Sequence, residues 1–316
     1  MKNLVAIIVG GTGQFGTITS KLLLKKKYKI IGICNPKKKS KIKLNNIDLK
    51  SIDLNDFKKI SELIKKTKPN EFYHLAAQSF INYKFEDEFF KLNPNINGTH
   101  YILSSIKKYS PKTKFYFAAS SEIFGDAKIY PQNEKSAFNP RSAYGISKVA
   151  GFQLTKNYRE AYNLFSCSGI LYNHESPLRN ENFVSKKITT AIARIVSKKQ
   201  KNLTLGSINA KRYWGYAGDY VEAMWKMLQQ KKPQDFVIGT GKMHSVKDFL
   251  NIAFKRVGLD YKKYIKFDKK FMRPKDHIIL QADYKKAKKK LNWQPKTNFK
   301  QLVHKMVDFD ISKLKK

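Results

Sequence analysis

A serine, a glutamate, a tyrosine and a lysine in the middle of the chain are residue types that together could move protons. Ser120 and Glu122 follow the apolar stretch FYFAA, and Tyr144 and Lys148 lie in YGISK. Residues four apart on a helix share one face, so the tyrosine and the lysine are predicted to be neighbours. A phenol normally loses its proton at about pH 10, and a cation held close to it lowers that pKa. The four residues therefore predict a site in which Tyr144 acts as a base near neutrality.

Tyr and Lys at this spacing also occur by chance, above all in a chain with 63 basic residues. The chemical interpretation is supported by a glycine-rich loop near the N-terminus. The apolar run from Leu4 to Val9 predicts a strand buried on both faces, and it leads into GGTGQFG and a predicted helix over residues 14–27. Gly10 permits a tight turn, Gly13 lets the backbone approach a pyrophosphate, and Gly16 allows close helix packing. Because amides at a helix start attract phosphates, the loop predicts a dinucleotide site.

The second predicted strand, residues 28–34, ends without the acid that an NAD site usually places there to hold the ribose diol. The chain reads Asn35, Pro36 and then three lysines beginning with Lys37. Cations at this position favour a 2′-phosphate, so the sequence predicts NADP rather than NAD, although the lysines could also reflect composition alone. Asp53 and Leu54, at the end of the next predicted strand, are expected beside the adenine.

Strands and helices are predicted to alternate along most of the chain. Further strands are predicted over residues 47–54, 71–77, 114–119, 165–172 and 236–238, and helices over 55–66, 94–108, 185–197 and from about 218. This alternation predicts an α/β fold with a doubly wound parallel (Rossmann) sheet, which binds ligands at the carboxyl ends of its strands. The polar stretch NHESPLRNENF interrupts the alternation, so a smaller, interleaved C-terminal substrate lobe is expected. The predicted division is a dinucleotide-binding domain of residues 1–172 and 211–240 and a substrate lobe of residues 173–210 and 241–316.

The chain of 316 residues has a formal net charge of +39, which first suggests nucleic-acid binding. Only seven of its 63 basic residues are Arg, however, and the lysines are spread over every predicted helix rather than gathered into a stripe with aromatic residues. We therefore expect a basic surface that attracts an anionic substrate, and no nucleic-acid partner. Cys34 and Cys167 are too few for a disulfide framework or a metal cluster, and no apolar run is long enough to span a membrane. A cytoplasmic protein without a metal is predicted.

Several longer segments are more specific than these motifs. NPRSAYG, NYREAYNLF, GILYNHESPLRNENFVSKKI, NAKRYWGYAGDYVEAMW, GKMHSVKDF and KKLNWQP together resemble the GDP-mannose 4,6-dehydratase branch of the extended short-chain dehydrogenase/reductase family, along nearly the whole chain. The chain departs from the family pattern at Ser120, where the family usually has Thr. Its loop after the second strand is shorter and lacks the paired arginines that in the family bind the 2′-phosphate and join subunits. The resemblance implies a homodimer or homotetramer.

The resemblance implies a redox-neutral dehydration of GDP-mannose to GDP-4-keto-6-deoxymannose. Tyr144, with Lys148 nearby, would remove the proton of the sugar 4-hydroxyl while the C4 hydride passes to NADP+. Glu122 would take the C5 proton and then assist loss of the C6 hydroxyl as water, before the hydride returns to C6. Ser120 would hydrogen-bond the C4 oxygen as charge develops there.

The resemblance also implies which residues bind the two ligands. The cofactor would contact Gly10, Gly13, Gln14, Phe15, Gly16, Asn35, Lys37, Asp53, Leu54, Leu75, Ala76, Ala77, Ser79, Tyr144, Lys148, His174 and Arg179. The substrate would contact Gln78, Ser79, Ser120, Glu122, Asn173, Val184, Lys187, Arg212, Arg273 and Asp276. Arg212 and Arg273 are the candidates for the diphosphate, because a guanidinium pairs with phosphate oxygens through two donors. For His174, a structural hydrogen bond is an equal alternative.

Two other interpretations stay open. The same fold could serve a GDP-heptose, UDP-sugar or dTDP-sugar dehydratase, or a decarboxylase. A basic Rossmann protein could also bind a dinucleotide or nucleic acid without catalysis, although the complete set of Ser120, Glu122, Tyr144 and Lys148 argues against this.

Overall fold

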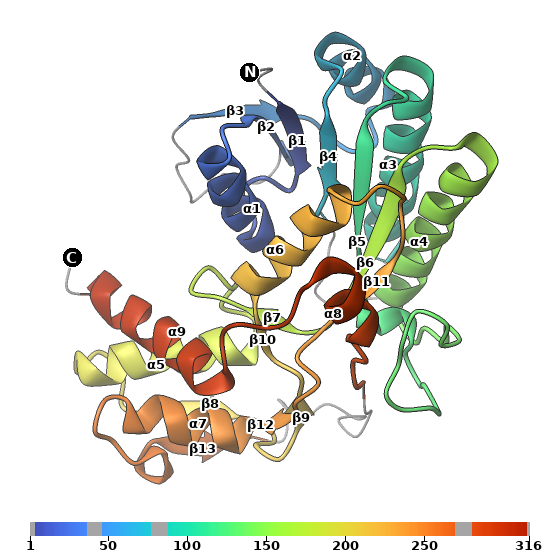
Figure 1. Cartoon of the computed structure of the whole chain (residues 1–316). Coiled ribbons are helices and arrows are strands. Elements are labelled where there is room, and N and C mark those ends of the chain that lie inside the picture. Colours follow the sequence, from blue (N-terminus) through green and yellow to red (C-terminus); the bar gives the residue numbers. More distant parts are fainter. Residues whose placement is uncertain (1–3, 37–45, 77–87, 269–279, 315–316) are drawn as a thin grey trace.

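The computed structural model describes residues 4–36, 46–76, 88–268 and 280–314. Its centre is a parallel sheet of seven strands in the order β3-β2-β1-β4-β5-β6-β11 (Figure 1). The strands are β1 (Val5–Val9), β2 (Lys29–Cys34), β3 (Ile47–Ser51), β4 (Glu71–His74), β5 (Lys114–Ser120), β6 (Ser166–Leu171) and β11 (Phe236–Ile238). The strand order reverses between β1 and β4, the place where sheets of this kind bind ligands. The predicted doubly wound parallel sheet is confirmed.

Helices cover both faces of the sheet (Figure 1). One face carries α2 (Phe57–Thr67), α3 (Glu88–Tyr109) and α4 (Ala143–Tyr162), and the other carries α1 (Gln14–Lys25) and α6 (Ala217–Leu228). The helix α4 begins where the Ser142 hydroxyl accepts a hydrogen bond from the Gly145 amide, and it ends at Asn163, whose φ is 53°. These two caps set the length of the helix that presents Tyr144 and Lys148.

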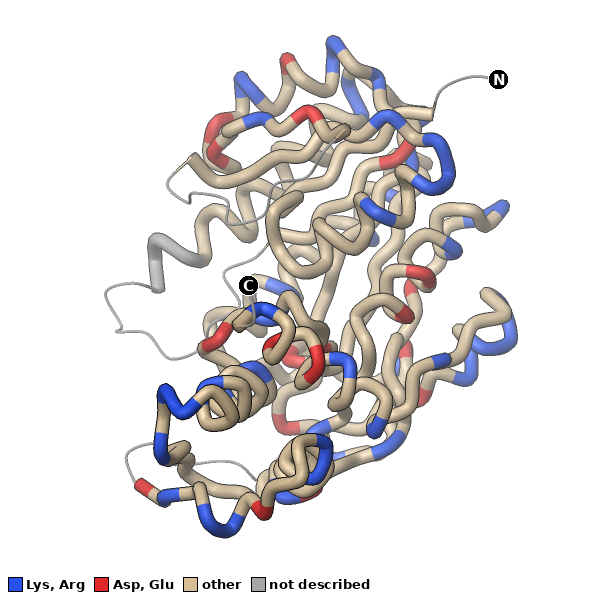
Figure 2. The backbone as a smooth tube through the Cα atoms, turned by 90° about the vertical axis from the view of Figure 1, so that its left-hand side faces the viewer, with Lys and Arg blue, Asp and Glu red and all other residues tan. Residues whose placement is uncertain are grey.

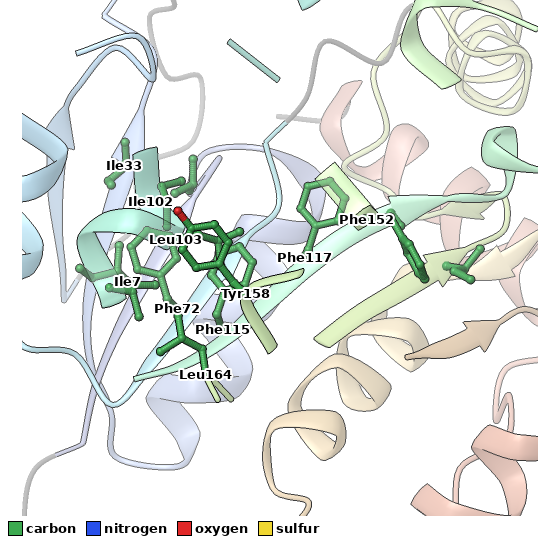
Figure 3. Packing of buried hydrophobic residues seen from close by; sticks show 14 of the residues in the cluster. Ile7, Ile33, Phe72, Ile102, Leu103, Phe115, Phe117, Phe152, Tyr158 and Leu164 are labelled. Carbon is green, nitrogen blue, oxygen red and sulfur yellow. The ribbon is translucent and has the colours of Figure 1, made fainter. Parts of the chain in front are cut away.

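The core on the α2–α3–α4 face is built mainly from aromatic and branched side chains of six strands and three helices, and part of it is shown in Figure 3. Phe72, Phe115 and Phe117 stand on the sheet, and Phe152 and Tyr158 of α4 pack over them. All five are less than a tenth exposed. Burial of this apolar area holds α4 against β5, and so holds the tyrosine and lysine of α4 beside the end of the strand that carries Ser120.

A second apolar cluster lies away from the sheet, in a smaller lobe (Figure 1). The lobe is built from α5 (Val184–Val196), β8 (Leu203–Leu205), α7 (Val246–Lys255), a 3-10 turn (Tyr261–Lys263), β13 (Ile265–Phe267) and α9 (Phe299–Leu314). Trp214 is buried here against the rings of Phe249 and Phe299. Between this lobe and the sheet run two-residue strands that pair as β7 (His174–Glu175) with β10 (Gly215–Tyr216), and as β9 (Lys211–Arg212) with β12 (His244–Ser245). The exact domain boundaries stay a prediction.

The chain returns to the sheet before its last helix. A further apolar cluster covers the α1–α6 face of the sheet, and it includes Ala287 and Leu291 of the short helix α8 (Lys285–Leu291) and Trp293. The Trp293 indole donates a 2.8 Å hydrogen bond to the Asp219 carbonyl of α6. Residues 285–293 therefore complete the core of the sheet, although they lie within the range predicted for the substrate lobe.

Basic residues are spread over both lobes with acidic residues between them (Figure 2). Within the described ranges, no helix is long and apolar enough to cross a membrane. No three His, Cys, Asp or Glu side chains gather as metal ligands in that same part of the chain.

Candidate active site

A cleft of about 1380 Å³ opens at the carboxyl ends of the strands, where the strand order reverses. Twenty of the predicted site residues line it, and they come from elements far apart in the sequence. They are Gly10, Gly13, Gln14, Phe15, Gly16, Asn35, Asp53, Leu54, Leu75, Ala76, Ser120, Glu122, Tyr144, Lys148, Asn173, His174, Arg179, Val184, Lys187 and Arg212. The other six predictions, Lys37, Ala77, Gln78, Ser79, Arg273 and Asp276, lie outside the described residues.

The glycine loop has the geometry that a phosphate site needs. Gly10 has a φ of +83°, a left-handed conformation that side chains disfavour, and its amide donates to the Ile33 carbonyl at 2.9 Å. A Cβ on Gly16 would lie 2.1 Å from the Gly10 carbonyl oxygen, so only glycine lets α1 approach the loop this closely. Gly13 is the N-cap of α1, and no side chain caps the first amides of that helix. The start of the helix is therefore able to bind an anion through its N–H groups.

The strands β2 and β3 place polar residues at the adenosine end of the loop. Asn35 directly follows β2, and Asp53 follows β3, where its carboxylate accepts a 2.9 Å hydrogen bond from the Asn55 amide. The first described residues after β2, Asn35 and Pro36, include no acid. The residues of the loop and of these strand ends fit a dinucleotide diphosphate and its ribose.

Ser120 and Glu122 lie where β5 ends. Ser120 caps the 3-10 turn η2 (Ser121–Ile123), and its hydroxyl accepts a 3.3 Å hydrogen bond from the Glu122 amide. The Tyr144 phenol, which comes from the first turn of α4, lies close enough to this hydroxyl for the hydroxyl to lower its pKa. A serine, a carboxylate and a phenol are thus brought to one end of the cleft, as predicted.

Lys148 is a neighbour of Tyr144, and its ammonium group is hydrogen-bonded to the backbone of β5. Its Nζ lies 5.8 Å from the centre of the Tyr144 ring and donates a 2.6 Å hydrogen bond to the Ala118 carbonyl. Burial lowers the pKa of Lys148 to about 7, which weakens it as a cation. The pKa of Tyr144 is raised to about 12, by burial and by the charge of Glu122, against the lowering effects of the Ser120 hydrogen bond and of Arg179. Among the described cations, Arg179 lowers the pKa of Tyr144. The role expected of Lys148 toward Tyr144 stays a prediction.

His174 and Arg179 enter the cleft from the segment after β6. The His174 ring stacks on Phe15 with centres 4.0 Å apart, and its Nδ1 is 2.9 Å from the Tyr172 carbonyl. Burial and the charge of Arg179 lower the pKa of His174 to about 3, so the ring is neutral and must donate from Nδ1 to that carbonyl. Arg179 lies 3.4 Å from the centre of the Phe183 ring, and its Nε is 3.2 Å from Glu175 Oε2.

The other end of the cleft is formed by the smaller lobe. Val184 is the first residue of α5, and Lys187, one turn later, donates a 2.8 Å hydrogen bond to the Thr204 carbonyl. Burial lowers the pKa of Lys187. Arg212 comes from β9 and donates at 2.7 Å to its neighbouring Lys211 carbonyl. The Asn173 carbonyl accepts from the Gly215 amide at 2.9 Å, which joins this end to the sheet.

The family model described as GDP-mannose 4,6 dehydratase matches residues 7–306. The chain belongs to the GDP-mannose 4,6-dehydratase family. It is 41% identical over 329 residues to GDP-mannose 4,6 dehydratase 1 of Arabidopsis thaliana, covering 99% of this chain and 91% of that protein. It is 38% identical over 342 residues to the Homo sapiens GDP-mannose 4,6 dehydratase, covering 97% of this chain and 91% of that protein. The family predicted from the sequence segments is confirmed.

Solved structures share the fold of this family member. A UDP-glucose 4-epimerase of Thermotoga maritima with UDP-glucose superposes with a TM-score of 0.88 at 23% identity, covering 98% of this chain and 100% of that one. A dTDP-glucose 4,6-dehydratase of Bacillus anthracis in complex with NAD has a TM-score of 0.83 at 20% identity, with coverage of 97% and 96%. RMD of Pseudomonas aeruginosa complexed with NADPH has a TM-score of 0.83 at 19% identity, with coverage of 98% and 98%.

Four charged residues that line the cleft of this GDP-mannose 4,6-dehydratase family member were not predicted: Arg141, Glu175, Glu181 and Lys211. Glu175 is 3% exposed, and its carboxylate accepts from the Ser185 hydroxyl at 2.5 Å besides pairing with Arg179. Arg141 lines the cleft and lies 3.3 Å from Asp126. Because Arg is scarce in this chain, the presence of an arginine at position 141 was a sign that it could have a function. For Glu175, nothing in the sequence HESPLRN indicated that the carboxylate would be buried.

Proposed function

We propose that the protein dehydrates GDP-mannose to GDP-4-keto-6-deoxymannose without net oxidation. The observation that carries this proposal is that a chain of this family brings Ser120, Glu122, Tyr144 and Lys148 into one cleft with a glycine loop built for a diphosphate. A bound nicotinamide dinucleotide would supply the reversible hydride acceptor that the reaction needs. The remaining chemistry is proton transfer and charge stabilisation, and these four side chains are of the types that perform it.

Each of the four side chains has a proposed role. Tyr144 takes the proton of the sugar 4-hydroxyl as C4 is oxidised, and Ser120, whose hydroxyl lies near that phenol, stabilises charge on the C4 oxygen. Glu122 takes the proton from C5, made acidic by the new ketone, and returns it to the C6 hydroxyl, which leaves as water. Hydride return to C6 and a proton on C5 complete the product. Lys148 keeps the end of β5 in place through its hydrogen bond to Ala118.

The cofactor proposed is NADP rather than NAD. The support is the absence of an acid directly after β2, at Asn35 and Pro36, together with the lysines that follow in the sequence. Lys37 and Asn35 are proposed to face the 2′-phosphate, and the neutral His174 with Arg179 the nicotinamide half. Titration with NADP+ and NAD+ checks this, and tighter binding of NAD+ would contradict it.

The nucleotide-sugar is proposed to lie along the smaller lobe. Lys187 and Arg212 would meet the diphosphate, together with Arg273, and the other predicted contacts are Gln78, Ser79, Asn173, Val184 and Asp276. A homodimer or homotetramer is proposed from the resemblance of the sequence to the family, and a cytoplasmic location from the two unpaired cysteines, Cys34 and Cys167.

The test is incubation of the purified protein with GDP-mannose, followed by mass spectrometry. Loss of one water with a 4-keto product is expected, and turnover of a GDP-heptose alone would favour the alternative substrate. In the Glu122→Gln variant, C4 oxidation should continue while water loss stops. Unchanged dehydration by that variant would remove Glu122 from its role.

A further inference from the structure

The first turn of α1 holds the segment of residues 174–176 on two sides. The Gln14 side chain donates from Nε2 to the His174 carbonyl at 3.3 Å and accepts at Oε1 from the Ser176 hydroxyl at 2.6 Å. The next residue, Phe15, stacks on the His174 ring. Both polar ends of the Gln14 amide are thus used by a segment 160 residues away in the sequence.

Ser176 continues this connection toward Arg179. It is 1% exposed, its hydroxyl also accepts from the Leu178 amide at 3.1 Å, and its carbonyl accepts from the Arg179 amide at 3.0 Å. The position of Arg179 therefore depends on the turn that Ser176 organises, and that turn is tied to Gln14. A buried hydroxyl with this many partners has few alternative arrangements.

We propose that Gln14 is a positioning residue, whose side-chain amide fixes the segment carrying His174 and Arg179 at one distance from the glycine loop. The proposal rests on the dinucleotide site proposed above. The backbone of the glycine loop would bind the diphosphate. The Gln14 side chain would hold the segment with His174 and Arg179 in place on the opposite side of the cleft, where the nicotinamide half would lie. The sequence prediction that Gln14 binds the cofactor thereby becomes a prediction that it acts through its protein partners.

The experiment compares a whole dinucleotide with the same molecule lacking nicotinamide. Binding of NADP+ and of 2′-phospho-ADP-ribose, and of NAD+ and ADP-ribose in parallel, is measured for the wild type, Gln14→Ala, Ser176→Ala and the double variant. The control is Ser197→Ala, which removes a hydroxyl bonded only to its own helix at the end of α5. None of these measurements requires turnover of a sugar.

Ser176→Ala should weaken the intact dinucleotide about tenfold, because the segment would then hold its binding position only about a tenth of the time. The dissociation constant of the ligand that lacks nicotinamide should change by less than about twofold in Ser176→Ala. The control variant, Ser197→Ala, should bind both ligands as the wild type does. The double variant should bind the dinucleotide no more weakly than either single variant does. Equal losses of affinity for the intact and the truncated ligand would show damage to the glycine loop and would overturn the proposal. Unchanged affinity for both ligands would also overturn it. Failure of every dinucleotide to bind would overturn the proposed cofactor as well, whereas failure to turn over GDP-mannose would affect only the proposed substrate.

Discussion

Two Arg–Asp pairs of nearly equal geometry differ in burial, and they allow a quantitative prediction about the helix that carries Tyr144. Arg159 of α4 pairs with Asp235 through two hydrogen bonds of 2.9 and 2.7 Å, with side chains 15% and 12% exposed. Arg256 pairs with Asp308 through two of 2.9 and 3.0 Å, with side chains 44% and 50% exposed. Asp235→Ala should destabilise the protein strongly, and Asp308→Ala should serve as the matched control.

The size of the effect follows from what each change leaves without a partner. Removing one member of a buried pair costs about 3–5 kcal/mol. Asp235→Ala would leave the Arg159 guanidinium and the Ser168 amide, which donates to Asp235 at 2.7 Å, without their acceptor. Because Arg159 keeps its bond to the Ser166 carbonyl and some contact with water, we expect the lower figure, about 3 kcal/mol. Asp308→Ala should have little effect, since solvent screens its pair.

The assay is urea unfolding followed by circular dichroism, with the bound nucleotide content matched between variants. At a slope of about 3 kcal/mol per molar urea, a loss of about 3 kcal/mol lowers the midpoint by about 1 M. Asp308→Ala should stay at the wild-type midpoint. Similar midpoints for the two variants would refute the reasoning that burial, rather than pairing geometry, sets the contribution of these pairs.

Three further predictions concern the buried His74, the glycine loop and Arg179. Burial, with a contribution from Lys148, lowers the pKa of His74 from 6.5 to about 3, so below pH 6.5 the unfolded chain binds a proton that the folded chain does not. Stability should therefore fall as the pH drops from 6.5, and His74→Gln should lose less melting temperature between pH 7 and pH 5 than the wild type does. Gly16→Ala should bind NADP+ much more weakly than the wild type in a titration; equal affinity would contradict the 2.1 Å approach of a Cβ at this position to the Gly10 carbonyl oxygen. Arg179→Met should lower turnover at neutral pH with saturating dinucleotide, because Arg179 lowers the pKa of Tyr144 and the phenolate fraction falls as that pKa rises; unchanged turnover would assign that effect to another group.

Much of the fold could be predicted because its strands are continuous apolar runs between helices. The range Phe236–Ile238 agrees with the prediction to the residue, and the glycine spacing correctly placed the loop before α1. The helix α1 ends at Lys25, two residues before the predicted end, because Lys27 takes a φ of 63°. Such ends depend on backbone conformation that a lysine-rich sequence does not reveal.

The site could be predicted by residue type but not by electrostatics. Spacing placed Tyr144 beside Lys148, yet the pKa of each depends on burial, and burial arises from packing against β5 and the 173–183 segment. The Lys148 bond to Ala118 and the Glu175 pair with Arg179 join residues that no local pattern connects. The same holds for Gln14 and Ser176.

The late return of the chain to the sheet has a consequence for synthesis on the ribosome. Ala287, Leu291 and Trp293 fill the α1–α6 side of a sheet whose first strand is made almost 300 residues earlier. That side cannot be completed until nearly the whole polypeptide has emerged, so the nascent sheet exposes apolar surface during most of translation. Shortening the chain before Trp293 would leave that surface permanently open to aggregation, whatever happens to the catalytic residues.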